Sequence, residues 1–132
     1  MTRGLLSHVE IYVSDLKKSS DFWGWFLQEI GYQSYQSWDQ GRSWKLGDTY
    51  FVIMQAEDRF KSSPYHRKNV GLNHLAFYAR DAADVDSMTK ELQGRGTVIL
   101  YPERHPYAGG ENCYAVFFED PDRIKVEFVA KK

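Results

Sequence analysis

The sequence predicts an α+β fold made of two tandem βαβββ modules, with a helix on the outer face of each module's sheet. Strand-like runs at residues 6–13 and 72–78 are about 66 residues apart, half the length of this 132-residue chain. Each run is followed by a short polar turn, a helical pattern and three further strand-like runs. Such repetition predicts two similar mixed four-stranded sheets, whose uncovered faces curve around a common cavity.

In the first module, Asp15 follows the opening strand and is suited to cap a helix. Apolar residues recur at helical spacing over residues 16–30, and Gly31 is suited to end that helix. Gly24 inside the helix costs about 1 kcal/mol relative to alanine, which indicates a close approach by another group. The remaining strands are expected at about residues 32–38, 42–46 and 49–55.

The second module repeats this plan. Asp81 is placed to cap a helix whose apolar face carries Ala82, Val85, Met88 and Leu92. Glycines at positions 94 and 96 end that pattern. The later strands are expected at about residues 97–101, 114–118 and 124–129.

We therefore expect one domain over residues 1–132, built from half-modules at about 1–57 and 70–132. The joining linker, residues 58–69, is charged, contains Ser and Pro, and shows no clear period.

Alternation along the strands predicts which side chains each face presents. Val9, Ile11 and Val13 are apolar and are expected to face a helix, which leaves His8, Glu10 and Tyr12 on the opposite face. By the same reasoning, His74 and Tyr78 in the second module face away from their helix. In the last strand Val126 and Phe128 pack, and Lys125 and Glu127 share the opposite face.

The overall composition excludes several functional classes. A formal net charge of −1, with scattered Lys and Arg, gives no support for a nucleic-acid or membrane partner. The single cysteine, Cys113, permits no intramolecular disulfide, and we expect it to be a small packing residue. The N-terminus shows no signal-peptide pattern and no apolar run has membrane-spanning length, so the expected location is cytoplasmic.

Aromatic residues make up 16% of the chain, which is enough to line a pocket as well as a core. Those near predicted strand ends are candidates for the wall of a substrate pocket, with the core or a dimer interface as the alternative. These candidate substrate-binding residues are Trp38, Trp44, Tyr101, Tyr107 and Tyr114.

Several local motifs are similar to those of a known family. They are His8 in the first strand, Phe22-Trp23 in the first helix, and the segment 71–76, which contains His74. The strongest is the segment 118–127, where Asp120-Pro121-Asp122 is followed by Glu127, seven residues after the first Asp. Arg123 stands where the family usually has Gly.

On these motifs the whole chain resembles the vicinal-oxygen-chelate superfamily, which includes glyoxalase I, bleomycin resistance proteins and extradiol dioxygenases. The resemblance implies metal ligands at His8, His74 and Glu127, and a fourth at Gln55 or Glu57. Gln55 is preferred because it ends the apolar run 50–54.

Two imidazoles, a carboxylate and an amide oxygen suit a divalent ion such as Zn, Ni, Co, Mn or Fe. Four protein ligands on an octahedral ion leave two adjacent positions, at which a small substrate can chelate through neighbouring oxygens. The resemblance implies proton transfer through an enediolate-type intermediate, with Glu127 as the catalytic base.

The function expected from this resemblance is that of a glyoxalase I-like (lactoylglutathione lyase-like) lyase or isomerase. One alternative is an isomerase resembling methylmalonyl-CoA epimerase, which the ligand order His, Gln, His, Glu favours. A second alternative is a metal-free protein that binds a drug or metabolite, like the bleomycin resistance proteins, but those generally lack the histidines. Thiol transfer to fosfomycin stays open. A homodimer is expected, because single modules of this kind commonly pair.

Overall fold

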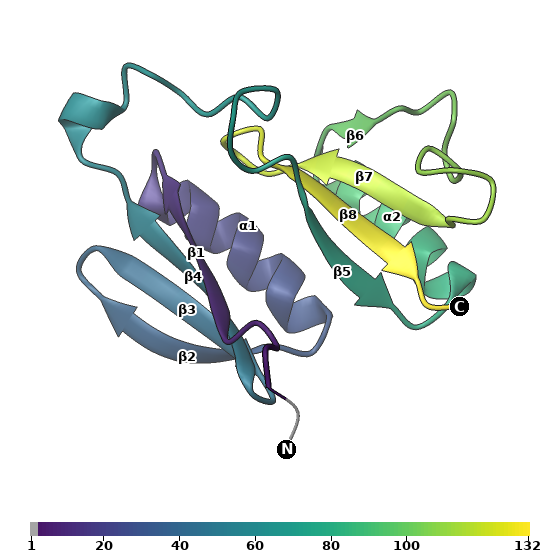
Figure 1. Cartoon of the computed structure of the whole chain (residues 1–132), viewed down its shortest axis with the longest axis horizontal. Helices are drawn as coiled ribbons and strands as arrows, with labels where there is room; N and C mark the ends of the chain where they lie inside the picture. Colours follow the sequence, from purple (N-terminus) through teal and green to yellow (C-terminus); the bar gives the residue numbers. More distant parts are fainter. Residues whose placement is uncertain (1–2) are drawn as a thin grey trace. The chain divides into compact units, whose positions relative to one another are not determined.

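The computed structural model describes residues 3–132, which divide into two compact units: unit 1, which ends at Pro64, and unit 2, Tyr65–Lys132. Unit 1 contains β1 (His8–Val13), α1 (Leu16–Glu29), β2 (Gln33–Trp38), β3 (Gly41–Leu46), β4 (Thr49–Gln55) and the short 3-10 helix η1 (Asp58–Phe60). Unit 2 contains β5 (Leu75–Ala79), α2 (Ala82–Gly94), β6 (Ile99–Leu100), β7 (Ala115–Glu119) and β8 (Lys125–Ala130) (Figure 1). No helix in residues 3–132 is long and apolar enough to cross a membrane.

The two units have the same strand order, which confirms the predicted α+β fold. Unit 1 has a four-stranded sheet in the order β1-β4-β3-β2, and unit 2 has one in the order β5-β8-β7-β6. In each sheet the first and last strands of the unit pair in parallel, and the other neighbours pair antiparallel. Each unit is thus a mixed sheet with its helix on one face (Figure 1).

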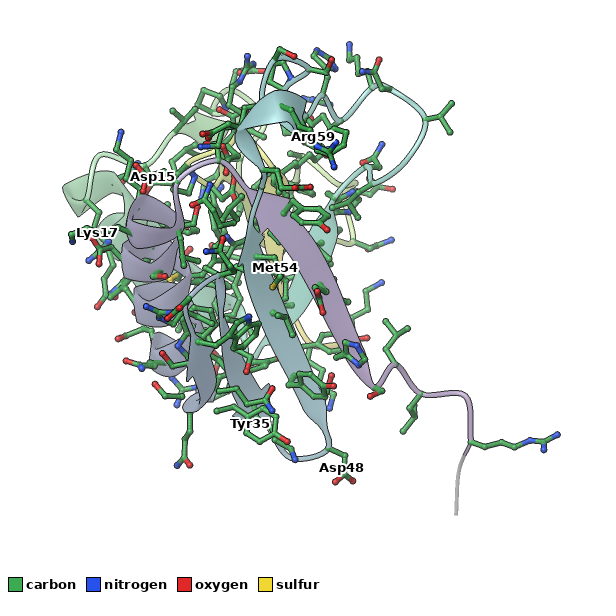
Figure 2. The ribbon with its side chains drawn as sticks, turned by 90° about the vertical axis from the view of Figure 1, so that its left-hand side faces the viewer. Asp15, Lys17, Tyr35, Asp48, Met54 and Arg59 are labelled. Atoms are coloured by element: carbon green, nitrogen blue, oxygen red, sulfur yellow. The ribbon has the colours of Figure 1, made fainter. Side chains whose placement is uncertain are left out.

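Helix α1 begins and ends where the sequence predicts. The Asp15 carboxylate accepts a hydrogen bond from the backbone N–H of Lys18, which satisfies one unpaired donor at the helix start. Figure 2 shows Asp15 at that end of the helix, which runs along one side of the strands. Gly31 follows the helix with a φ of +108°, the left-handed conformation that favours glycine at this position.

The core of unit 1 lies between α1 and the sheet. Trp23, on α1, is fully buried, and its ring centroid is 4.5 Å from that of Phe51 on β4. The indole of Trp44, on β3, packs against Gly24, where an added Cβ would lie 3.3 Å from Trp44 Cζ2. The expected close approach at Gly24 is confirmed. The approaching group is a core tryptophan.

In unit 2, Asp81 caps α2 by accepting a hydrogen bond from the backbone N–H of Asp84, as predicted. Val126 and Phe128 of β8 are buried, together with a face of α2 formed by Val85, Met88, Thr89 and Leu92. Strand β6 is shorter than the predicted run 97–101. Tyr101 has a φ of +54°, which takes its backbone out of the extended conformation and ends the strand.

The turn between β7 and β8, which contains Arg123, is held by the side chain of Asp120. The Asp120 carboxylate accepts hydrogen bonds from the backbone N–H groups of Asp122 and Ile124, both at 2.8 Å. Arg123 adopts the left-handed conformation, with a φ of +67°, and its guanidinium lies 3.4 Å from the Glu119 carboxylate. The hydrogen bonds to Asp120 therefore hold the turn in a conformation that costs a non-glycine residue energy.

Two buried serines of unit 1 are expected to respond oppositely to alanine. Ser19 is fully buried on α1 and its hydroxyl has no hydrogen-bond partner among the described residues. Ser43 is also buried, but its hydroxyl accepts a hydrogen bond from the backbone N–H of Gln36. Urea unfolding should show S19A more stable by about 0.5–1 kcal/mol, since alanine favours helix and buries no polar group. S43A should be less stable by about 1–2 kcal/mol, because it leaves a donor unpaired. Equal effects of the two changes would contradict this account.

Candidate metal-binding site

Unit 2 brings His74 and Glu127 into direct contact. His74 immediately precedes β5, and Glu127 lies in β8 opposite Ala76 of β5. The His74 Nε2 atom is 3.0 Å from Glu127 Oε1, and the two side chains are 32% and 12% exposed. Both lie on the sheet face opposite α2, because Val126 and Phe128 occupy the face toward the helix. We call this the helix-free face.

Further polar groups fix this pair. The side-chain amide of Asn73 lies 2.6 Å from His74 Nδ1. The Cys113 thiol donates to the second Glu127 oxygen, Oε2, with a Sγ–O distance of 3.6 Å. Burial and the adjacent Glu127 charge raise the pKa of the Cys113 thiol, which favours the neutral form that donates this hydrogen bond. Both oxygens of Glu127 are therefore in contact with a titratable neighbour.

The sequence predicted Cys113 as a packing residue, but the structure places it between Glu127 and a cavity. The thiol is half-buried. A cavity of about 420 Å³ lies beside it, lined by Gly109, Gly110, Glu111, Asn112, Cys113, Val129, Ala130 and Lys132. Cys113 therefore contacts Glu127 and also contributes to the wall of this cavity.

A cationic and aromatic cluster adjoins the pair on the same face. The Phe117 ring is edge-on to both His74, at 6.1 Å between centroids, and Tyr101, at 5.7 Å. The Lys125 ammonium donates a hydrogen bond to the Tyr101 hydroxyl, 3.0 Å away. This hydrogen bond, with the positive charges of Lys125, Arg67 and Arg104, lowers the pKa of Tyr101 below its ordinary value.

In unit 1, His8 lies on the face of the sheet opposite α1, as alternation predicts. Its ring stacks on that of Tyr50, with centroids 4.4 Å apart, and Tyr50 is its partner on β4. Glu10 and Tyr12 are exposed on the same face, whereas Val13 is buried. His8 is itself exposed. Its role as a metal ligand stays a prediction.

Gln55 does not share the face of His8. It is the register partner of Val13 and shares its face of β4 with Phe51 and Ile53, which are buried on the α1 side. Its Oε1 atom accepts a hydrogen bond from the backbone N–H of Leu16, at 2.9 Å. Its Nε2 atom donates to the backbone carbonyls of Ser14 and Ala56, at 2.9 and 3.1 Å.

The structure therefore does not support the assignment of Gln55 as the fourth ligand. Its amide holds the start of α1 against the end of β4, and its oxygen is already occupied by a backbone donor. The β4 side chain that shares the face of His8 at this level is Met54, the partner of Tyr12. The other candidate, Glu57, lies beyond β4, where its carboxylate is 3.5 Å from Arg59.

The aromatic candidates for substrate binding occupy different environments. Trp44 is a buried core residue, so the expectation that it lines a substrate pocket is wrong. Trp38 is partly exposed at the end of β2, and Tyr107 is exposed in the loop after β6. Tyr114 donates a hydrogen bond from its hydroxyl to Asp86 on α2, at 2.6 Å. Tyr101 alone among these five lies in the cluster beside His74 and Glu127.

Sequence reasoning missed three neighbours of this pair: Asn73, Cys113 and Phe117. Phe117 is the register partner of Glu127, so strand pairing would have identified it. Asn73 and Cys113 lie outside the strands, and no period in the sequence places them.

Comparison with known proteins identifies the family. Residues 5–128 match the model of the Glyoxalase/Bleomycin resistance protein/Dioxygenase superfamily. The chain belongs to this superfamily. It is 57% identical over 125 residues to the uncharacterized Bacillus subtilis protein YqjT, a match that covers 95% of this chain and 98% of that protein.

Solved structures of this superfamily have the same fold. A crystal structure of a candidate glyoxalase from Bacillus halodurans is 56% identical, covers 98% of this chain and 97% of that one, and has a TM-score of 0.96. Lactoylglutathione lyase from Agrobacterium tumefaciens is 21% identical, with a TM-score of 0.67 and coverage of 98% and 94%, which shows a common fold alone.

Members of this superfamily often bind metals, and the residues present fit such an ion in part. His74 and Glu127 supply an imidazole nitrogen and a carboxylate oxygen, the donors that a borderline divalent cation prefers. Over the described residues, neither unit gathers three His, Cys, Asp or Glu side chains around one point. A complete set of ligands would therefore require donors beyond this pair.

Replacing Gln55 by leucine should destabilise the protein without changing its metal content. The change removes the side-chain acceptor of the Leu16 N–H and should lower the free energy of unfolding by about 1–2 kcal/mol. Urea unfolding and metal analysis of the same preparation would measure both effects. Gln93→Leu, at an exposed position of α2, is the matched control and should change stability by less than about 0.5 kcal/mol. Loss of metal at unchanged stability would restore Gln55 as a ligand.

Replacing Lys125 by methionine should raise the pKa of Tyr101. Lys125 is the first cause of the lowered Tyr101 pKa, because its ammonium stabilises the phenolate oxygen. An NMR titration of ring-labelled tyrosine would follow the change. Lys131→Met removes an ammonium that lies over the Tyr78 ring and should leave the pKa of Tyr101 unchanged. An unchanged Tyr101 pKa in K125M would contradict the assignment of this contact.

Proposed function

We propose that this chain is a metal-dependent, glyoxalase I-like lyase or isomerase. Its substrate would be a small molecule that chelates a divalent cation through adjacent oxygens. The observation that carries the proposal is the contact between His74 Nε2 and Glu127 Oε1 at 3.0 Å on the helix-free face of unit 2. We propose His8 as a further ligand, on the strength of the sequence prediction.

The environment of Glu127 is suited to a ligand that also transfers protons. Its side chain is largely withdrawn from water, and no Lys or Arg neutralises it among the described residues. A buried carboxylate without a cationic partner is costly unless hydrogen bonds or a metal compensate it. His74 and Cys113 supply two hydrogen bonds, and a bound cation would compensate the remaining charge.

A bound divalent cation would polarise a carbonyl oxygen of the substrate and so make the adjacent C–H more acidic. Glu127 is the base that would accept that proton, because it is a carboxylate on the helix-free face with no Lys or Arg ion pair among the described residues. His74 Nε2 would bind the cation in place of its contact with Glu127 Oε1, while Asn73 Oδ1 holds His74 Nδ1 and the Cys113 thiol holds the carboxylate through Oε2. Substrate oxygens approaching Glu127 would meet the Phe117 ring.

The structure weakens one alternative and strengthens another. The epimerase reading drew support from Gln55 as the second ligand, and that amide is bonded to the start of α1 instead. The metal-free binding reading gains from the direct His74–Glu127 hydrogen bond, which satisfies both groups without an ion. Metal analysis distinguishes it from the enzyme reading.

The decisive experiment is metal binding by the purified full chain. Wild-type protein should bind a divalent ion stoichiometrically, and His74→Ala or Glu127→Gln should weaken that binding by at least tenfold, or about 1.4 kcal/mol, because a direct ligand is lost. His8→Ala should do the same if His8 is a ligand. His66→Ala, at an exposed position of unit 2, is the matched control and should bind as wild type does.

Activity then separates the reactions. Isomerisation of the hemithioacetal of glutathione and methylglyoxal would support the glyoxalase reading, whereas deuterium exchange into an acyl-CoA thioester would support the epimerase reading. Absence of metal binding by the wild-type chain, or full binding by E127Q, would exclude the proposed metal-dependent function.

A further inference from the structure

We propose that Lys125 and Tyr101 form a subsite that binds a carboxylate group of the substrate beside the His74–Glu127 pair. The subsite deepens the proposed function, on which its catalytic purpose rests. Binding of an anion at this subsite would require neither a bound metal nor catalytic turnover. It can therefore be measured independently of the proposed function.

The Lys125 ammonium is held by aromatic groups. Its nitrogen lies 4.9 Å from the ring centroid of Tyr101 and 5.1 Å from that of Phe117, and it donates to the Tyr101 hydroxyl at 3.0 Å. An ammonium has three donors, and this hydroxyl accepts only one of them. No carboxylate in the described part of the chain forms an ion pair with Lys125. The remaining N–H donors can therefore bind an external oxygen.

The surrounding charge is positive. The Arg104 guanidinium lies over the Tyr101 ring, 4.7 Å from its centroid, and its own contact with exposed Glu103 is long, at 3.8 Å. The carboxylate nearest to Lys125 in the strand register is Glu119, opposite it on β7. Glu119 is already held by Arg67 at 2.8 Å and by Arg123 at 3.4 Å.

Those two arginines more than neutralise Glu119, so it does not cancel the charge of Lys125. An anion entering the subsite would meet the Lys125 ammonium, the Arg104 guanidinium and the Tyr101 hydroxyl. These are one strong charge-assisted donor, one delocalised cation and one neutral hydrogen-bonding group. Such a combination matches the two oxygens of a carboxylate.

The subsite and the candidate metal ligands share one surface. Lys125 and Glu127 are alternate residues of β8, so their side chains project from the same face with Cα atoms roughly 7 Å apart. The Phe117 ring contacts both His74 and Tyr101 and spans the interval. A substrate with its chelating oxygens at His74 and Glu127 would thus place a carboxylate a few bonds away at Lys125. This indicates a short-chain organic acid as the substrate class.

Binding of acetate to the metal-stripped full chain tests the subsite directly. Acetate should produce saturable NMR shifts at the backbone amides of Phe117 and Lys125 at constant ionic strength. Acetamide, its neutral isostere, should not. Lys125→Met keeps the stem of the side chain but removes the charge, and should weaken acetate binding at least about tenfold. Tyr101→Phe should weaken it less, because the ammonium remains.

The chain offers a matched control in Lys131, whose ammonium also lies over a tyrosine ring, that of Tyr78, at 5.7 Å. Lys131→Met should bind acetate as wild type does. Equal weakening by K131M would show general charge attraction and overturn the subsite, as would unchanged binding in K125M or equal shifts with acetamide.

A folded K125M is verified by its unchanged urea midpoint and by metal binding at His74 and Glu127. Acetate binding without metal binding would contradict only the proposed function, and the reverse would contradict only the subsite.

Discussion

The pairing of the first and last strands of each unit is the constraint on which the rest of the structure depends. Parallel pairing of β1 with β4, and of β5 with β8, requires a crossover, and the helix that provides it covers one face of the sheet. Every other side chain of these strands then faces a helix. The alternate set is left on the opposite face of each sheet, where His8 lies in unit 1 and where His74 and Glu127 lie in unit 2.

This arrangement gives Glu127 an unusual environment for a carboxylate. It lies on a central strand, flanked by β5 and β7, and is therefore shielded from water by its neighbours without being packed under α2. Its partners are an imidazole and a thiol. The Lys125 ammonium on the same face lies two residues earlier in β8, and it contacts Tyr101 and Phe117 rather than Glu127.

The sequence predicted those features that depend on local chemistry. The helix caps at Asp15 and Asp81, the glycine at position 31, and the alternation in β1 and β8 all follow from near neighbours in the chain. The face on which Gln55 lies could not be predicted from the sequence for a physical reason. Phe51, Val52 and Ile53 are all buried, so the central strand β4 shows no alternation from which its faces can be read.

Trp44 shows the same limit of sequence reasoning. Strand β3 buries Ser43 and Trp44 in succession, so the pattern does not separate a pocket wall from a core residue. The pairing of Trp44 with Gly24 decides the matter, and that contact joins residues on different elements. The contacts of Cys113 and Asn73 likewise depend on how loops close, which no period in the sequence encodes.

The turn at Arg123 has a consequence for the distribution of charge in unit 2. The backbone there is held by Asp120 rather than by the freedom of a glycine, and the arginine side chain is thereby released to contact Glu119. Arg67, from the segment that leads into β5, contacts the same carboxylate. Because Arg67 and Arg123 both contact Glu119, a substitution at this turn position would change the balance of charge around that carboxylate.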